Sequence, residues 1–247
     1  MNNAYVTLLS SEDYLDAVLV LAASLNRVHS RFPLLVAVVE DVYTPKMEYT
    51  LKNFGCLVTI ISRIEYGQET RALYEGNSVL NTASKLNLFT LDDYDKLVYM
   101  DADTLVLRNM DDLFTYPDGA MLYYSSEPTG TSGLFVFEPR KHQELRYYLS
   151  LINNFVVFDG NLLGELWFYV SSSPQHQIPS HYFYHYQPET SCPSNVIAVQ
   201  YCNSPKPWME PNHTSYSNLY PFARAYKEQL KEVLNQKEKI LKRWKGE

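Results

Sequence analysis

The chain has 247 residues, of which 46% are hydrophobic and 20% are charged. This length and composition suit a single α/β domain that buries one sizeable core. The formal net charge of -7 argues against a protein that binds nucleic acid through a broad basic face, so we expect no nucleic-acid partner. The sequence also contains no apolar run of about 18 residues, the length that a transmembrane helix needs, so we expect no transmembrane segment.

Cysteine usage and the N-terminal residues bear on the compartment. The three cysteines, Cys56, Cys192 and Cys202, are odd in number and lack the spacing of a metal site, which predicts free thiols. The chain starts with a strand-like segment, and no pattern of a signal peptide precedes it. Both features predict a cytoplasmic protein.

The first half of the chain alternates between strand and helix patterns. Buried strands are predicted at residues 4–9, 34–39, 56–61 and 96–100, and helices at 13–28, from Pro45 to Gly55, and around 84–90. The continuous apolar run at 34–39 is typical of a strand that is covered on both faces. Alternating strands and helices predict a mainly parallel sheet with right-handed crossovers, a Rossmann-like α/β fold.

The second half is less regular. Strands are predicted at 119–124 and 134–137, a helix at 140–153, and loops over the site at 171–217. Residues 225–245 have apolar side chains at helical spacing and end in a basic stretch. We therefore expect one domain at 1–224 and an amphipathic basic helix at 225–247. The helix is expected to pack on the domain, with a partner or an anionic membrane surface as the alternative.

The segment that indicates chemistry begins with the strand at 96–100 and continues into Asp101 and Asp103. Open α/β sheets bind ligands at the carboxyl ends of their strands. Two carboxylates separated by one residue at such an end can hold a hard cation, Mg²⁺ or Mn²⁺, which in turn neutralises a diphosphate. The same pair could also be solvated loop acids, but the apolar strand before it favours a site.

Two classes of enzyme use this pattern. In phosphatases of the haloacid dehalogenase class, an apolar strand leads to Asp-x-Asp-x-Thr, which residues 101–104 resemble. That motif normally lies near the start of its domain, and a later acidic pair holds the metal. Here the motif follows three predicted strands, and Asp159 is the only aspartate after Asp118. Both observations disfavour the phosphatase.

Five blocks of sequence resemble glycosyltransferase family 8, the family that contains glycogenin and galactinol synthase. They are the opening NAYVTLL at 3–9, NTASKL at 81–86, YMDADTLVLRNMDDLF at 99–114, GTSGLFVFEP at 130–139 and QYCNSPKPW at 200–208. All five occur in the order of the family, and the block at 99–114 is long enough to be highly specific. The resemblance extends over most of the chain.

This resemblance implies a Rossmann-like fold of the nucleotide-diphospho-sugar transferase (GT-A) type and a retaining hexosyltransferase with a UDP-sugar donor. It implies a Mn²⁺ or Mg²⁺ ion bound by Asp101, Asp103 and Gln200, and Asp159 as the residue that orients the donor. The residues that it places against the nucleotide sugar and metal are Thr7, Leu8, Tyr14, Lys85, Asp101, Ala102, Asp103, Ser132 and Lys206. Analogy with glycogenin also favours a homodimer, while the sugar and the acceptor stay unspecified.

The chain departs from the family pattern at three positions. Gln200 stands where the family has a histidine ligand, Thr131 where it has an asparagine, and Gly160 where it has a glutamine. The assignment of Asp159 depends on aligning residues 159–164 with the family's D-Q-x-L-L-N segment; a register closer to glycogenin would place Leu162 and Leu163 at the catalytic pair instead. These departures leave a second hypothesis open, a non-catalytic protein that binds a UDP-sugar on the same scaffold.

Overall fold

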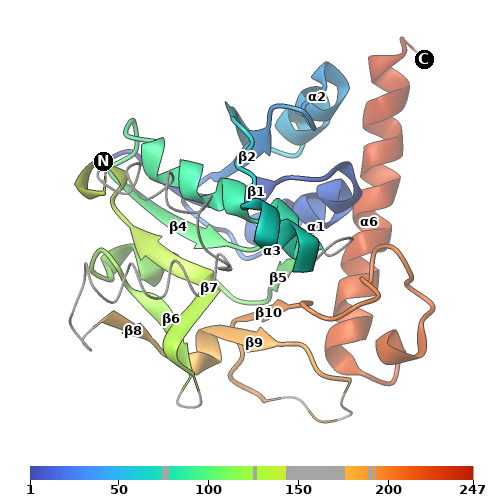
Figure 1. The fold of residues 1–247 in the computed structure, drawn as a ribbon. Coiled ribbons are helices and arrows are strands. Elements are labelled where there is room, and N and C mark those ends of the chain that lie inside the picture. The colour runs from blue at the N-terminus through green and yellow to red at the C-terminus, as the bar shows by residue number, and fades with distance from the viewer. Residues whose placement is uncertain (74–77, 125–126, 143–175, 189–190, 192, 247) are drawn as a thin grey trace.

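The computed structural model describes residues 1–73, 78–124, 127–142, 176–188, 191 and 193–246. Its main feature is a seven-stranded sheet with the order β3-β2-β1-β4-β7-β6-β8 (Figure 1). The strands are β1 (Asn3–Leu9), β2 (Leu34–Val39), β3 (Leu57–Ile61), β4 (Lys96–Met100), β6 (Met121–Tyr124), β7 (Glu127–Phe137) and β8 (Gln177–Ile178). Strands β3, β2, β1 and β4 are parallel, whereas β7 is antiparallel to β4 and to β6. The predicted Rossmann-like, mainly parallel architecture is confirmed.

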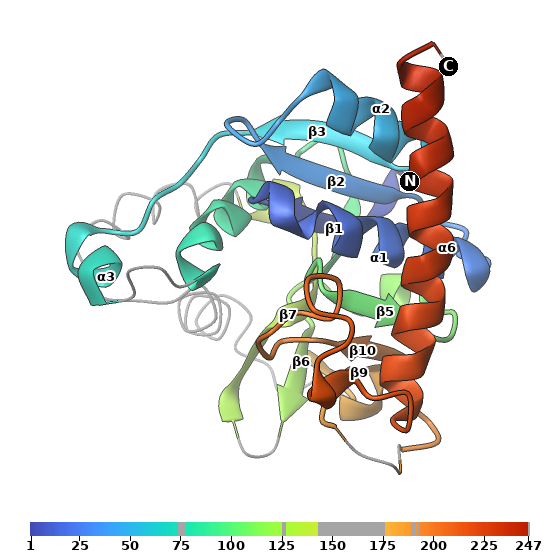
Figure 2. The same ribbon diagram turned by 90° about the vertical axis from the view of Figure 1, so that its right-hand side faces the viewer.

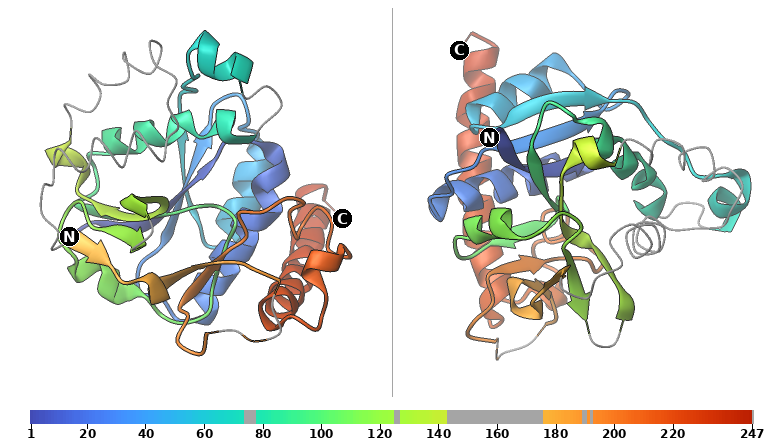
Figure 3. Two further views of the ribbon diagram at one scale, coloured as in Figure 1. Left: turned by 60° about the horizontal axis from the view of Figure 1, so that its bottom comes forward. Right: turned by 90° about the vertical axis from the view of Figure 1, so that its left-hand side faces the viewer.

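A second sheet of three short strands lies beside the first, in the order β5-β10-β9 (Figure 3). It consists of β5 (Thr104–Val106), β10 (Ala198–Gln200) and β9 (Phe183–His185). The prediction of loops throughout 171–217 is wrong for β8, β9 and β10. These strands have two or three residues each, so they cannot display the alternation from which strands are predicted, and their pairing partners lie far away in the sequence.

The helices follow local signals that are visible in the sequence. Helix α1 spans Leu15–Arg27, α2 spans Pro45–Asn53, α3 spans Gln68–Leu73 and α6 spans Pro221–Trp244. Pro45 occupies the first turn of α2, and the Thr44 hydroxyl caps that turn by accepting from the Met47 amide at 3.1 Å. Gly55 follows with a φ of 82°, a conformation that favours glycine at a helix end.

Two predicted helices differ from what forms. The helix expected around 84–90 is a 3-10 helix, Ala83–Thr90, and the start of the one expected at 13–28 is a 3-10 turn, Glu12–Tyr14. Of the helix predicted at 140–153, Pro139–Lys141 forms a 3-10 turn and residues 143–153 lie outside the described residues. None of the described helices combines the length and apolar character that crossing a bilayer requires.

The core has two halves, one on each face of the large sheet. Side chains alternate along each strand, so that Tyr5 and Val36 belong to one half while Val6 and Leu35 belong to the other. The first half is covered by α1, α6 and the small sheet, and the second by the 3-10 helix Ala83–Thr90. Burial on both faces explains the uninterrupted apolar run of β2 and the mostly apolar sequence of β1, which Thr7 interrupts.

Helix α6 packs lengthwise along α1 and α2 (Figure 2). Its buried face includes Tyr226, Leu230, Val233 and Ile240, whereas Leu234 and Trp244 are 43% and 44% exposed. The Trp244 ring also contacts Tyr49 of α2, with ring centroids 4.8 Å apart. The C-terminal helix begins at Pro221, before the residue 225 that the sequence pattern indicates, and contacts α1 and α2. The division of the chain at residue 225 stays a prediction.

Two leucines on α6 provide a matched test of this packing. We expect Leu230→Ala to lower the free energy of unfolding by about 2–4 kcal/mol, because it removes a buried side chain and leaves a cavity. Leu234→Ala, on the exposed side of the same helix, should change it by less than about 0.5 kcal/mol. Urea denaturation monitored by circular dichroism measures both values. Equal losses in the two variants would contradict the packing of α6 described here.

Asp111 is a buried carboxylate that joins β1 to the segment after α1. One oxygen accepts from the Tyr5 hydroxyl at 3.0 Å and the Ser30 hydroxyl at 2.8 Å, and the other accepts from the Arg31 amide at 2.9 Å. Burial alone would raise the pKa of Asp111, but these hydrogen bonds and one from Asn109 outweigh it and hold the pKa below its usual value. The ionised form is therefore the one that stabilises the fold.

The lowered pKa makes the stabilisation by Asp111 dependent on pH. The folded-state pKa lies below the unfolded value of about 4, so the stabilisation is complete above about pH 4 and is lost as the pH falls through the folded value. We expect Asp111→Asn to be less stable than the wild type by about 2 kcal/mol at pH 7, and this gap should narrow on acidification below about pH 4. Urea titrations at several pH values measure the gap.

The exposed Asp93→Asn serves as the control and should show no such gap. A difference between Asp111→Asn and wild type that is constant from pH 7 to pH 3 would contradict a lowered pKa.

Candidate active site

The candidate site lies at the carboxyl ends of β1 and β4. From β1 the chain continues to β2 and β3 on one side of it, whereas β4 lies on the other side of β1. The gap between β1 and β4 is therefore the switch point of the strand order, the place at which open α/β sheets bind ligands. Asp101 and Ala102 directly follow β4, and Asp103 directly precedes β5. The turn between the two strands therefore brings both carboxylates to the place that the sequence predicted.

Asp101 is held by three side chains. Its Oδ1 atom accepts a hydrogen bond from the Tyr99 hydroxyl at 2.7 Å and faces Lys85 Nζ at 3.2 Å. Its Oδ2 atom accepts from Gln200 Nε2 at 2.7 Å. Lys85 is 1% exposed and also lies over the Tyr99 ring, 4.7 Å from its centroid. These contacts fix the orientation of the carboxylate from three different segments of the chain.

Asp103 is paired through one oxygen only. Its Oδ2 atom lies 2.7 Å from Lys206 Nζ, which also donates to the Tyr201 carbonyl at 2.9 Å. Both side chains are almost buried. The other carboxylate oxygen, Oδ1, is buried without a hydrogen-bond partner among the described residues. A buried carboxylate oxygen in this situation is costly unless a ligand satisfies it.

The electrostatics of the site are close to balanced. Burial on its own would lower the pKa of Lys206, but the charge of Asp103 and its hydrogen bond outweigh burial and raise that pKa above its usual value. Lys206 therefore carries its positive charge. The charged side chains that line the described part of the cavity are Lys85, Lys206, Asp101 and Asp103, and their formal charges sum to zero.

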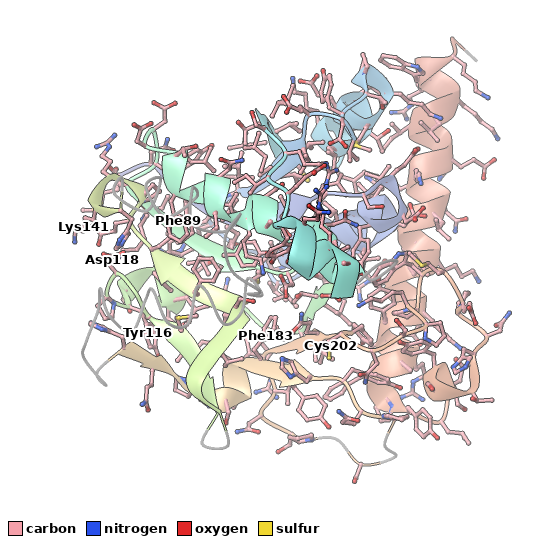
Figure 4. All side chains as sticks on the ribbon, viewed as in Figure 1. Phe89, Tyr116, Asp118, Lys141, Phe183 and Cys202 are labelled. Atoms are coloured by element: carbon pink, nitrogen blue, oxygen red, sulfur yellow. The ribbon has the colours of Figure 1, made fainter. Side chains whose placement is uncertain are left out.

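The small sheet brings the C-terminal residues of the site to the aspartates. Gln200 pairs with Thr104 in the antiparallel register of β10 and β5, which places it beside the turn at 101–103. Gly133 of β7 packs against this junction: a Cβ atom there would lie 3.0 Å from Gln200 Oε1 and 3.3 Å from Asp101 Oδ2. Phe183 would lie at 3.1 Å from the same Cβ, so only glycine fits without movement. Phe183 and Cys202 are labelled in Figure 4.

A cavity of about 300 Å³ opens over these groups. Most of the predicted ligand-binding residues line it, namely Leu8, Tyr14, Lys85, Asp101, Ala102, Asp103, Gln200 and Lys206. Thr7 is instead fully buried within β1. Ser132 does not line the cavity, but its backbone and side-chain oxygens both lie 3.3 Å from Lys85 Nζ.

Sequence reasoning did not assign six other residues that line the cavity, Ser10, Ser11, Asn81, Thr82, Tyr99 and Cys202. Ser10 and Ser11 follow the carboxyl end of β1, so their position at the switch point was an available signal. Tyr99 gave none, because a tyrosine within an apolar strand is equally typical of the core.

Trp208 and Tyr14 differ in their relation to the cavity, and Asp159 lies outside the described residues. Trp208 packs rather than lining the cavity: its ring lies 5.0 Å from that of Tyr14, and its indole nitrogen donates to the Asp13 carbonyl at 2.8 Å. Tyr14 packs on Trp208 and lines the cavity as well. Asp159, the predicted catalytic residue, and Gly160 lie outside the described residues, as do Leu162 and Leu163 of the alternative register.

The residues present suit a hard divalent cation. The donors are carboxylate and amide oxygens, which Mg²⁺ and Mn²⁺ prefer, and the Asp103 Oδ1 atom is buried without a partner from the described chain. No group of three His, Cys, Asp or Glu side chains among the described residues could hold a metal, and Gln200 is a described amide that could act as a third ligand beside the two aspartates. Gln200 Nε2 faces Asp101, and a half-turn of the amide would present Oε1 instead.

Comparison with known proteins agrees with this geometry. The model of glycosyl transferase family 8 matches residues 5–148. Galactinol synthase 7 of Arabidopsis thaliana is 38% identical over 117 residues, which cover 47% of this chain and 35% of the relative. Glycogenin-1 of Caenorhabditis elegans is 28% identical over 220 residues, covering 84% of this chain and 51% of the relative. The chain thus spans between about a third and half of these two relatives.

Solved structures share the fold at low sequence identity. The galactosyltransferase LgtC, solved with donor and acceptor sugar analogues, superposes with a TM-score of 0.64 at 16% identity and covers 92% of this chain and 95% of its own. The glycosyltransferase GlyE of Streptococcus pneumoniae TIGR4 gives a TM-score of 0.61 at 15% identity, covering 100% of this chain and 64% of its own. These likenesses establish the GT-A type of fold, and the match of more than half of the sequence to the family model establishes that this chain belongs to glycosyl transferase family 8.

Proposed function

We propose that the chain is a retaining hexosyltransferase that moves a sugar from a UDP-sugar to an acceptor hydroxyl, with Mn²⁺ or Mg²⁺ as its cofactor. The observation that carries this proposal is the convergence of Asp101, Asp103, Lys85 and Lys206 on one cavity at the switch point of the sheet. The proposed partners are the nucleotide sugar and an acceptor. A cytoplasmic location and a homodimer stay predictions.

The charge balance of the cavity supports a diphosphate bound together with a cation. The formal charges of the described side chains that line it sum to zero, so these side chains offer a diphosphate alone no net positive charge. A divalent ion held by Asp101 and Asp103, with Gln200 as a third ligand, would supply two positive charges and stabilise the negative charge of the leaving group. Family membership adds an independent reason to expect a sugar nucleotide.

Lys85 and Lys206 are proposed to stabilise the same diphosphate leaving group through their positive charges. During transfer, the bond between the anomeric carbon and the diphosphate oxygen breaks, and negative charge accumulates on the diphosphate. The acceptor oxygen bonds to the anomeric carbon, and its proton passes to the departing diphosphate. Lys206 lies at the cavity with its ammonium held by Asp103 and the Tyr201 carbonyl, so it is preorganised to meet this charge. Lys85 pairs with Asp101 instead of Asp103 in the turn at residues 101–103, which we call the acid turn. It is proposed to contact the donor.

Asp159 is proposed to orient the donor sugar and to stabilise the oxocarbenium-like state, as the family resemblance implies. A retaining transferase needs an electron-rich group near the reacting carbon, and a carboxylate meets that requirement. The assignment rests on the sequence alignment alone, because Asp159 lies outside the described residues.

A second candidate function has specific support. In a non-catalytic UDP-sugar-binding protein the dyad and lysines would be kept while the transfer step is lost, and the neutral Gln200 beside Asp101 fits this alternative. Thr131 and Gly160 point the same way. Turnover distinguishes the two functions, because both predict metal-dependent nucleotide binding.

The first test measures UDP release from UDP-glucose, UDP-galactose and UDP-N-acetylglucosamine with Mn²⁺, with Mg²⁺ or with EDTA. We expect release that requires the metal and that one donor supports best. Asp103→Asn should lower kcat/KM by about a hundredfold or more, because it weakens both the binding of the cation and the ion pair with Lys206. The matched control is Glu228→Gln on the exposed face of α6, which should behave like the wild type.

Tight, metal-dependent UDP binding without release from any donor would favour the non-catalytic alternative. No UDP binding in the presence of either metal would contradict both functions.

A second test concerns Gln200 as a metal ligand. An imidazole is a stronger donor to Mn²⁺ than a neutral amide oxygen, so we expect Gln200→His to tighten Mn²⁺ binding by about tenfold in the presence of UDP. Gln200→Leu keeps the size of the side chain without a donor and should weaken binding. Mn²⁺ titration followed by electron paramagnetic resonance measures both affinities. An unchanged affinity in Gln200→Leu would show that Gln200 is no ligand.

A further inference from the structure

Tyr99 is a buried tyrosine near the carboxyl end of β4, and the proposed function gives it no role. Its side chain is 2% exposed, and its ring stacks on that of Phe135, the residue opposite it on β7, with the ring centroids 4.9 Å apart. A phenylalanine would fill this place in the core equally well, whereas a buried hydroxyl needs a hydrogen-bond partner. The hydroxyl of Tyr99 therefore requires an explanation other than packing.

The partner of this hydroxyl is the carboxylate of Asp101. The Asp101 amide donates to the Gly133 carbonyl at 3.1 Å, which continues the pairing of β4 with β7 by one residue. Side chains two positions apart on a paired strand point to the same face, so Tyr99 and Asp101 lie side by side. The hydroxyl donates to Asp101 Oδ1 at 2.7 Å. A hydrogen bond to a charged acceptor is stronger than one between neutral groups.

The ring of Tyr99 makes a second contact with the same ion pair. Lys85 Nζ lies 4.7 Å from the ring centroid and 3.2 Å from Asp101 Oδ1. The Lys85 side chain is 2% exposed, and a cation over an aromatic face gains most where water is excluded. Tyr99 thus holds the acid of this pair through its hydroxyl and the lysine through its ring.

These contacts give the two oxygens of Asp101 different roles. Oδ1 is engaged by Tyr99 and Lys85, whereas Oδ2 contacts the amide of Gln200. A half-turn of that amide presents its oxygen, so Oδ2 is the oxygen that a cation can share with Gln200. The Asp101 side chain lines the cavity and is 25% exposed, which makes it accessible to a ligand. Asp101 is thereby limited to one oxygen for a cation.

The number of oxygens that a carboxylate offers affects which cation it binds. Ca²⁺ takes about 6–8 oxygen ligands and often both oxygens of one carboxylate, whereas Mg²⁺ is smaller and requires an octahedral arrangement. Mn²⁺ also accepts six oxygen ligands in an octahedron. Asp103 resembles Asp101 in this respect, because its Oδ2 atom is held by Lys206 at 2.7 Å. Two aspartates that each keep one oxygen on a lysine disfavour Ca²⁺.

We propose that Tyr99 is a positioning residue that sets the cation preference of the candidate site. By holding Asp101 Oδ1 and Lys85 together, it restricts Asp101 to a single oxygen for the cation and so favours Mn²⁺ or Mg²⁺ over Ca²⁺. Tyr99 acts through these two residues and has no catalytic role of its own. This inference rests on the proposed function, because it concerns the metal that the proposed function requires.

The test measures the affinities of the full chain for Mn²⁺ and Ca²⁺ in the presence of UDP. Electron paramagnetic resonance follows Mn²⁺ binding, and competition with Mn²⁺ gives the affinity for Ca²⁺. We expect the wild type to bind Mn²⁺ more tightly than Ca²⁺. Tyr99→Phe keeps the ring and loses the hydroxyl, so it should reduce this preference by about fivefold or more, because Asp101 then turns more freely to offer both oxygens.

The matched control is Tyr5→Phe. Tyr5 is also a buried tyrosine whose hydroxyl donates to a carboxylate, Asp111 at 3.0 Å, but it does not line the cavity. Both variants lose a buried hydrogen bond and should be less stable than the wild type in urea. Tyr5→Phe should nevertheless keep the wild-type preference for Mn²⁺, which separates cation selection from a loss of stability.

Three outcomes would overturn this inference while leaving the proposed function in place. They are a wild type that binds Ca²⁺ as tightly as Mn²⁺, a preference that Tyr99→Phe leaves unchanged because both affinities stay the same or fall by the same factor, and an equal loss of preference in Tyr5→Phe. A wild type that binds UDP with neither Mn²⁺ nor Mg²⁺ contradicts the proposed function, and this inference with it.

Discussion

The ion pairs around the acid turn are the constraint on which the site depends. Lys85 and Lys206 are almost fully buried, and a buried ammonium is tolerated only where an opposite charge and hydrogen bonds compensate it. Asp101 and Asp103 supply that compensation, so the geometry of the candidate site and the local stability rest on the same four residues. Because their charges cancel, an anionic ligand gains net attraction in this cavity only when a cation arrives with it.

The fold achieves this convergence by placing a small sheet of three strands beside the seven-stranded one. Strand β5 begins at Thr104, directly after Asp103, and pairs with β10, so residues almost a hundred positions apart in the sequence are joined by a backbone ladder. The Tyr201 amide donates to the Asp103 carbonyl at 2.9 Å and continues that ladder. On the opposite side, the Ser24 hydroxyl of α1 accepts from the Val106 amide at 3.1 Å. The acid turn is thereby fixed by the core rather than by a mobile loop.

The sequence was sufficient for features that local patterns encode. The strands β1, β2 and β4, the helix α2 with its proline start, and the acid turn all follow from apolar runs and caps within a few residues. Strands β8, β9 and β10 could not be predicted, because two or three residues carry no period and their partners are distant. Tyr99 escaped assignment for a related reason: its role depends on what lies across the cavity, which no local pattern records.

The role of Gln200 depends on which atom of its amide faces the acid turn. An amide offers a donor at one atom and an acceptor at the other, so Gln200 can restrain Asp101 through Nε2 or bind a cation through Oε1. A neutral imidazole, in contrast, can use one nitrogen for the cation and keep the other for a second partner. Gly133 packs closely against this side chain, since even a Cβ atom at position 133 would lie 3.0 Å from Gln200 Oε1. If the chain is the metal-dependent transferase proposed above, transfer depends on whether a bound metal stabilises the Gln200 oxygen more than the Asp101 hydrogen bond stabilises the Gln200 nitrogen.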